Sequence, residues 1–160
     1  MGIVLYRVDE RLIHGQVVIG WGSQLNPGRY VVVDDALAAS EWEQELYRLS
    51  LPEDVEAEFA TVKEARRKLP GWQEEEVRSV LLTRDLRTML ELGEAGLLEG
   101  ESVNVGGIHH APGRTQVRPY VYLDDEDRGR LHRFEELGVN VIARDLPDSV
   151  RVSLSTLLKE

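Results

Sequence analysis

Positions 7–17 read RVDERLIHGQV and gather two arginines, two carboxylates and a histidine where an apolar strand gives way to an expected helix. His14 stands directly before that helix, so the unpaired backbone N–H groups of the next three residues are expected to point toward whatever lies on or beside its ring. Those residues are Gly15, Gln16 and Val17. A helix start binds anions, and the missing side chain of Gly15 lets an anion come close to the backbone. The pattern predicts an oxyanion pocket at His14.

The charged residues of this turn suit phosphate or carboxylate chemistry. Arg7 and Arg11 supply bidentate donors for either anion. Asp9 or Glu10 is expected to hold one imidazole nitrogen of His14 protonated, which leaves the other nitrogen free as a nucleophile. The alternative is a solvent-exposed histidine beside a surface ion-pair cluster that contributes little stability. Residue spacing alone does not decide between the two interpretations.

The turn belongs to an alternation of short apolar strands and helical segments. Strands are expected at 3–8, 29–33, 55–59, 77–83, 102–105, 117–123 and 139–143. Helices are expected at 15–25, 40–49, 61–69, 85–92 and 125–137, and residues 150–158 read as a strand turning into a terminal helix. Such alternation builds right-handed βαβ units. We therefore expect an α/β fold, formed by residues 1–160 as a single domain: an open, mostly parallel, doubly wound sheet of about seven strands with helices on both faces.

Local signals set the expected limits of these elements. Residues 40–43 and 61–64 have the spacing of capping boxes, and Asp85 is expected to cap a helix. Pro70 is expected to end the helix before it. Pro119 suggests an edge position or an irregular start for the strand at 117–123.

A second turn, residues 106–114, follows the fifth expected strand. Ligands bind beyond the carboxyl ends of the strands in such sheets, so this turn is expected beside His14. Its candidate site residues are Gly106, Gly107, His109 and Arg114. The two glycines permit close backbone approach, and the arginine is a candidate phosphate ligand. His109 or His110 is interpreted either as a group for phosphate donation or partner recognition, or as polar surface.

Another interpretation concerns Asp34, Asp35 and Asp85, which follow strands as in a receiver domain that binds magnesium and is phosphorylated on aspartate. That site also requires a lysine at a late strand end. The lysines stand at positions 63, 68 and 159, none at such a turn. The aspartates are therefore interpreted as helix caps or solvated edge residues.

Composition excludes several classes of protein. The net charge of −10 argues against nucleic-acid binding, and the absence of cysteine excludes disulfides and thiolate metal sites. The first residues lack a secretory signal and the chain lacks a long apolar run, so a cytoplasmic location is expected. The three tryptophans, Trp21, Trp42 and Trp72, are interpreted either as a partner surface or as core, and the core is expected; His132 is expected on the surface.

Three short segments resemble the enzyme IIB component of the mannose/sorbose family of the bacterial phosphoenolpyruvate-dependent sugar phosphotransferase system. They are RVDERLIHGQV at 7–17, SVNVGG at 102–107 and GRTQV at 113–117. The resemblance implies an open α/β domain whose His14 takes a phosphoryl group on Nδ1 from a IIA histidine. The group then passes to a sugar held by membrane IIC and IID components, with which the protein is associated at the membrane. A homodimer is also implied, and transfer between histidines requires no metal and no cofactor.

His109 and His110 stand where sugar-transporting members tend to carry apolar or aromatic residues. This departure keeps an alternative open, a regulatory, phosphorylation-dependent interaction module with the same fold and no transport role. A third hypothesis is an anion-binding domain that is not phosphorylated.

Overall fold

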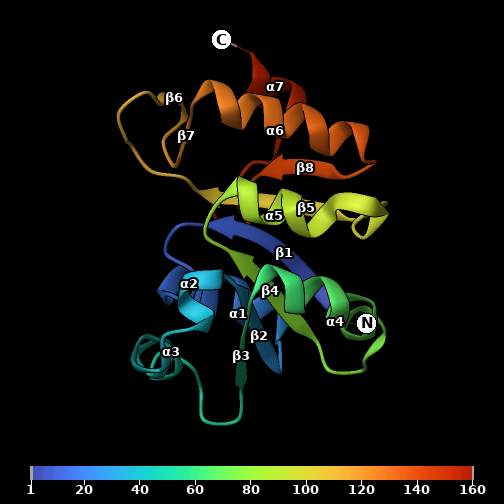
Figure 1. The fold of residues 1–160 in the computed structure, drawn as a ribbon. Coiled ribbons are helices and arrows are strands. Elements are labelled where there is room, and N and C mark those ends of the chain that lie inside the picture. Colours follow the sequence, from blue (N-terminus) through green and yellow to red (C-terminus); the bar gives the residue numbers. More distant parts are fainter. Residues whose placement is uncertain (1, 160) are drawn as a thin grey trace.

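A computed structural model describes residues 2–159 of the protein, which form a twisted central sheet flanked by helices (Figure 1). Seven strands pair in the order β3-β2-β4-β1-β5-β8-β9. Their bounds are β1 Ile3–Asp9, β2 Arg29–Val33, β3 Glu56–Ala60, β4 Ser79–Thr83, β5 Ser102–Gly107, β8 Asn140–Ala143 and β9 Val152–Ser153. All pairs are parallel except β8 with β9. The expected open, mostly parallel, doubly wound α/β sheet is confirmed.

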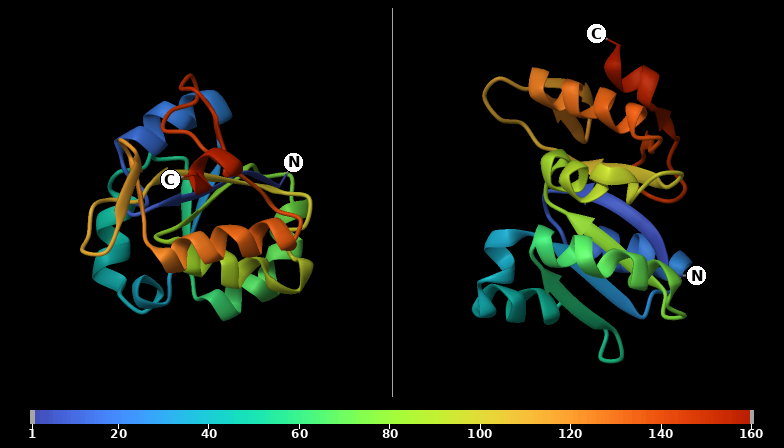
Figure 2. Two further views of the ribbon diagram at one scale, coloured as in Figure 1. Left: turned by 90° about the horizontal axis from the view of Figure 1, so that it is seen from above. Right: turned by 45° about the vertical axis from the view of Figure 1, so that its right-hand side comes forward.

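Helices cover both faces of this sheet. Figure 2 (left) shows α4, α5 and α6 along one face and the first helical segment, in blue, on the other. That segment is a π-helix at Gln16–Trp21 continued by α1 at Gly22–Leu25. The remaining helices are α2 Asp35–Ala38, α3 Glu41–Arg48, α4 Val62–Glu74, α5 Leu86–Gly93, a short 3-10 turn Glu94–Gly96, α6 Asp125–Glu136 and α7 Leu154–Leu158. None of the helices between residues 2 and 159 has the length and apolar character needed to cross a bilayer.

Alternate side chains of the strands fill two separate cores, because each central strand is buried on both faces. On β2, Val31 and Val33 pack into the core shared with α4, α5 and α6, whereas Tyr30 and Val32 pack into the core under the first helical segment. Leu12, in the turn after β1, also belongs to this second core. The charged turn is therefore anchored by an apolar side chain only two residues before His14.

Several local predictions hold. The capping box at residues 61–64 is present, Asp85 accepts a hydrogen bond from Thr88 N at 2.8 Å, and Asp34 caps α2. His132 is exposed as expected. Trp21 and Trp72 are buried, but Trp42 is 69% exposed, so its expected core position is wrong.

Two local predictions, one for Pro70 and one for residues 40–43, are wrong. Pro70 lies inside α4, which continues to Glu74 because Leu69 and Trp72 on either side of the proline are both buried. Tertiary packing outweighs the lost backbone hydrogen bond there. Residues 40–43 do not form a capping box, since Ser40 makes no side-chain capping hydrogen bond.

The region at 117–123 is two strands instead of one. β6 (Thr115–Arg118) and β7 (Val121–Leu123) form a separate antiparallel hairpin around Pro119. The proline breaks the expected strand because it fixes the backbone and lacks an N–H donor. The expected place of this segment in the main sheet is therefore wrong, and the short C-terminal strand β9 completes the seven.

Candidate functional site

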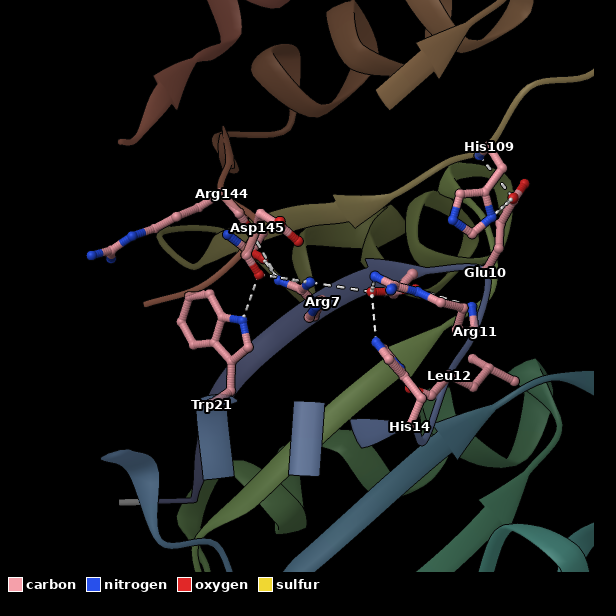
Figure 3. Close-up of polar contacts among 11 residues, drawn as sticks. Arg7, Glu10, Arg11, Leu12, His14, Trp21, His109, Arg144 and Asp145 are labelled. Atoms are coloured by element: carbon pink, nitrogen blue, oxygen red, sulfur yellow. Dashed lines mark hydrogen bonds and ion pairs between the residues drawn. The ribbon is translucent and has the colours of Figure 1, made fainter. Parts of the chain in front are cut away.

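Arg7, near the end of β1, has a completely buried guanidinium with four hydrogen bonds (Figure 3). Its Nη1 donates to Asn104 Oδ1 and, at 3.0 Å, to the carbonyl of Arg144. Its Nη2 donates to the carbonyl of Asp145 at 3.0 Å and to Asp9 Oδ2 at 3.2 Å. Both terminal nitrogens of Arg7 are thus occupied by protein groups from β1, β5 and the segment after β8.

Trp21 and Gly106 enclose this guanidinium. Arg7 Cζ lies 5.3 Å from the centre of the Trp21 ring, and Trp21 Nε1 donates to the same Asp145 carbonyl at 3.0 Å. A side chain at Gly106 would occupy the space of the Arg7 guanidinium. The close approach predicted for this glycine is therefore real, and the group that approaches is Arg7.

Asp9 is a buried carboxylate held between two arginines. Oδ1 accepts from the backbone N–H and the Nε of Arg11, both at 3.0 Å, and Oδ2 accepts from Arg11 Nη2 at 3.0 Å and from Arg7. Burial by itself raises the pKa of Asp9, but the Arg11 hydrogen bonds and the Arg7 charge outweigh it and lower the pKa. A Cβ at Gly107 would lie 2.8 Å from Asp9 Oδ1. Glycine there makes room for an ionised Asp9.

The ring of His14 lies between this carboxylate and its own turn. Nδ1 is 2.8 Å from the carbonyl of Leu12, whose φ of 57° is the left-handed region and turns that carbonyl toward the ring. Nε2 is 3.7 Å from Asp9 Oδ2, and it is buried without a hydrogen-bond partner among residues 2–159. Asp9 lies beside the ring but makes no hydrogen bond to it, and the ring nitrogen that is hydrogen-bonded faces the Leu12 carbonyl, so the predicted orienting role of Asp9 stays a prediction.

Burial favours the neutral form of the His14 ring. Burial lowers its pKa, and the Leu12 hydrogen bond and the Asp9 charge oppose this effect only partly. With one proton on the ring, the short Nδ1 contact requires that proton on Nδ1, where it is donated to Leu12. The remaining lone pair is then on Nε2.

Arg11 and Gly15 offer open positions next to His14. The Arg11 side chain is 34% exposed, and its Nη1 has no hydrogen-bond partner among the described residues. A Cβ at Gly15 would meet nothing within 4 Å. The N–H groups of Gly15 and Gln16 likewise make no hydrogen bond within residues 2–159. These groups are accessible to an anion bound at the ring.

The expectation of a free N–H at Val17 is wrong. Val17 N donates to the carbonyl of His14 at 3.1 Å, and Val18 N donates to the same carbonyl at 2.9 Å. Gly15 is helical as expected, at φ −54° and ψ −43°, but the Val17 bond spans three residues, so hydrogen bonding begins one residue earlier than in a regular α-helix.

The second turn contacts the first through Glu10. Its Oε1 accepts from the backbone N–H of His109 at 2.8 Å and lies 3.0 Å from His109 Nδ1, and its Oε2 accepts from Arg114 Nη1 at 2.9 Å. Arg114 Nη1 also donates to the His109 carbonyl at 2.7 Å. The predicted meeting of the two turns is confirmed. Glu10 joins the turns, and Asp9 is the carboxylate beside the ring.

Asp34, Asp35 and Asp85, the residues of the receiver-domain interpretation, each bind another part of the fold. Asp34 Oδ2 accepts from Arg84 Nε at 3.0 Å, and Asp35 Oδ1 accepts from the backbone N–H of Val62 at 2.8 Å. Asp85 caps α5. Nowhere in residues 2–159 do three histidine, aspartate or glutamate side chains gather closely enough to hold a metal ion.

Sequence reasoning missed the groups that surround Arg7. Asn104 and the carbonyls of Arg144 and Asp145 follow from sheet order, which brings β5 and the end of β8 beside β1. One signal was present in the sequence, since Asn104 is a polar residue between two valines of a buried strand. A buried amide requires a partner, and Arg7 is that partner.

Comparison with known proteins gives a consistent set of similarities. Residues 3–160 match the family model described as the PTS system sorbose subfamily IIB component. The N-acetylgalactosamine-specific phosphotransferase enzyme IIB component 1 of Escherichia coli (strain K12) is 33% identical over 146 residues, 91% of this chain and 91% of that protein. The PTS system mannose-specific EIIAB component of the same strain is 30% identical over 160 residues, 100% of this chain and 49% of that protein. The IIBSor domain of the sorbose permease from Klebsiella pneumoniae superposes with a TM-score of 0.87 at 26% identity, over 98% of this chain and 96% of that one.

Proposed function

Because the chain belongs to the sorbose subfamily of phosphotransferase-system IIB components, we propose that it carries a phosphoryl group between two partners during sugar uptake. It accepts the group on His14 from a phosphohistidine of a IIA protein and passes it to a sugar bound by membrane IIC and IID components, at the cytoplasmic face of the membrane. A relative named EIIAB supports IIA as the donor, because its name joins an A and a B component. The homodimer stays a prediction.

One observation carries the assignment of His14. A neutral imidazole stands beside the ionised Asp9, within reach of the open Arg11 guanidinium and the unpaired N–H groups at Gly15 and Gln16. A neutral ring is the nucleophilic form of histidine. The Arg11 guanidinium and these N–H groups suit the charged equatorial oxygens of a phosphoryl group during transfer. Positioning and charge stabilisation are most of what such a transfer requires of a protein.

The transfer itself exchanges one P–N bond for another. A ring-nitrogen lone pair of His14 attacks phosphorus while the P–N bond to the donor histidine breaks, and the bonding pair returns to the donor nitrogen. In the second step a sugar hydroxyl oxygen attacks phosphorus, its proton leaves to a base, and the His14 nitrogen recovers its pair. Neither step needs an oxidant, reductant or metal.

Phosphorylation at Nδ1, which the family resemblance implies, requires a movement of the ring. Nδ1 donates to Leu12 in this structure, and Nε2 is buried. Rotation about the Cβ–Cγ bond breaks the Leu12 hydrogen bond, at a net cost of about 1 kcal/mol. Solvent exchanges the ring proton from Nδ1 to Nε2. The lone pair of Nδ1 is then free for phosphorus.

We assign Arg7 a positioning role in place of the direct phosphate contact expected from the sequence. Its terminal nitrogens are fully used by Asn104, Asp9 and two backbone carbonyls, and its side chain is buried. It acts through Asp9, whose carboxylate it fixes beside the ring. Arg11 is the arginine that we expect to bind phosphate, because its Nη1 has no hydrogen-bond partner among the described residues.

The second turn supports the first without a phosphate contact of its own in this proposal. Arg114 and His109 are occupied by Glu10, and the glycines make room for Arg7 and Asp9. We infer that these contacts hold the loop against the charged turn. A phosphate on His14 is then bound by Arg11 and by the backbone N–H groups at the helix start.

Incubation with the phosphorylated IIA protein of the same system tests the proposal. We expect acid-labile label on the wild type, none on His14→Ala, and wild-type labelling of the double variant His109→Ala/His110→Ala. Phosphorus NMR of the labelled protein is expected to give a nitrogen-bound phosphate signal. Label that persists on His14→Ala would remove this residue from its role.

A further inference from the structure

Three exposed apolar side chains form one stripe on the helix α3 and its first following residue. Trp42 is 69% exposed, Leu46 55% and Leu49 82%. Their spacing of four and three residues places them on a single face, which we call the α3 stripe. Single exposed apolar residues are ordinary, but an adjoining set this large marks an interaction surface.

The opposite side of α3 fixes the stripe in its outward position. Gln44 Nε2 donates to the carbonyls of Leu37 at 2.9 Å and Ala38 at 3.1 Å. The ring of Tyr47 packs on Phe59 with the ring centres 6.4 Å apart. The helix is therefore anchored to α2 and β3 by one face, and its apolar residues are exposed on the other.

A groove connects the α3 stripe to the charged turn that carries His14. Its volume is about 260 Å³, and Trp42 and Leu46 line it together with Ile13, the residue directly before His14. Figure 1 shows α2 and α3 at the same end of the sheet as the arrowhead of β1, where that turn begins. Ile13 is 3% exposed and precedes His14 in the chain, so part of the groove wall belongs to the turn that carries the histidine.

The area that a protein donor must cover reaches this groove. A partner of standard size buries about 800 Å² on each side, a disc of roughly 16 Å radius. A donor must bring its phosphorus to bonding distance of His14, so its footprint is centred there, and we infer that it extends over the groove beside Ile13. An aromatic side chain beside a pocket near the centre of an interface is the usual anchor of binding.

We propose that the α3 stripe, with the groove beside Ile13, is the docking surface for the phosphorylated IIA donor protein, an inference that rests on the proposed function. The exposed acidic residues Glu41 and Glu45 flank the stripe, and Glu45 pairs with Arg48 at 2.7 Å, so Glu41 is the acid of this rim whose charge is not paired on α3. Anionic lipid headgroups repel such a rim, which favours a water-soluble partner over the membrane surface. The matching surface on the donor has an apolar centre with lysine or arginine around it.

The test compares two phosphoryl donors on one set of variants. The double variant Trp42→Ala/Leu46→Ala removes the stripe beside the groove, and Val150→Ala is the matched control, since Val150 is 81% exposed outside α3. Phosphoramidate, a small donor that needs no docking surface, reports the chemical competence of His14. The phosphorylated IIA protein reports docking and chemistry together.

We expect kcat/KM with phosphorylated IIA to fall at least tenfold in the double variant, mainly through KM, while labelling by phosphoramidate stays within twofold of wild type. Val150→Ala is expected to match the wild type with both donors. Wild-type transfer from IIA to the double variant would overturn the docking proposal and leave the proposed function intact. If only the later transfer to sugar in membrane vesicles is lost, the stripe belongs to a membrane partner and the docking proposal is wrong. Failure of IIA to label the wild type would overturn both proposals.

Discussion

Arg7 Nη2 and Asp9 Oδ2 lie 3.2 Å apart, and both side chains are completely buried. Two buried charges lose their hydration, and only close pairing with further hydrogen bonds compensates for that loss. Here Asp9 also binds Arg11, and Arg7 also binds Asn104 and two carbonyls after β8. The pair joins three segments of the sheet beneath His14, so it fixes the position of the carboxylate that the ring faces.

Arg7→Met is expected to be strongly destabilising. It leaves Asp9 buried with one arginine in place of two, and loss of one partner from a buried ion pair costs about 3–5 kcal/mol. Arg133→Met is the control, because the side chains of Arg133 and its partners Glu94 and Glu136 are all exposed and an ion pair near solvent contributes about 1 kcal/mol or less. Urea denaturation measures both. Equal, small losses would show that the buried pair does not stabilise the fold.

Gly106→Ala and Gly15→Ala are expected to act differently. The first places a methyl group on the Arg7 guanidinium, and overpacking of this kind costs about 1–3 kcal/mol. The second meets open space, so its stability stays within about 0.5 kcal/mol of wild type. Because the open space is where the phosphoryl group approaches, Gly15→Ala is expected to accept phosphate several-fold more slowly from phosphoramidate. Unchanged labelling of Gly15→Ala would show that the phosphoryl group does not approach His14 through the space beside Gly15.

Acceptance of phosphate is expected to persist in mildly acidic solution. The pKa of His14 is lowered from 6.5 by burial, so at pH 6.5 more than half of the rings remain neutral and nucleophilic. Labelling by phosphoramidate between pH 5 and 8, with NMR titration of the His14 ring protons, measures this. A midpoint at or above pH 6.5 contradicts the buried environment of the ring.

The same shift has a consequence for stability. Between the lowered pKa of folded His14 and 6.5, the unfolded chain binds more protons than the folded one, so the free energy of unfolding rises with pH in that window. We expect this dependence to be weaker in His14→Gln, whose side chain does not titrate. Urea titrations of both proteins across the window provide the measurement. A parallel dependence in the two proteins would assign the effect to other groups.

The resting ring is expected to carry its proton on Nδ1. The 2.8 Å contact with the Leu12 carbonyl requires a donor at that nitrogen. Long-range proton–nitrogen correlation spectra distinguish the two neutral tautomers. A protonated Nε2 in the unphosphorylated protein would contradict the contact, whereas a change of pattern on phosphorylation is expected if Nδ1 is the acceptor.

Glu10→Ala is expected to loosen the second turn. It removes the acceptor of the His109 N–H and the partner of Arg114, so amide hydrogen exchange over residues 109–114 becomes faster. These contacts are close to solvent, so the loss of global stability is expected to be about 1 kcal/mol or less. Unchanged exchange would mean that other contacts hold the turn.

Much of the site was readable from local patterns. Strand–helix alternation predicted the parallel sheet, and the parallel sheet predicted that the turn at His14 and the turn at 106–114 share one edge. The short motifs in these turns also indicated the family to which the chain belongs. Both predictions depend on the order of strands and helices along the chain, which hydrophobic periodicity reports, and on the βαβ crossover, which makes the joined strands parallel.

The sequence by itself determined the composition of the charged turn: a histidine before a helix, with arginines, an aspartate and a glycine at fixed short spacing. Only the tertiary structure decided which arginine is free. Arg7 is occupied by Asn104 and Arg144, which are 97 and 137 positions away along the chain, whereas Arg11 stays near solvent. Strand order brings such partners together, and burial then makes each polar group take a partner. Neither effect has a local signature, so the difference between the two arginines appears only when the sheet is assembled.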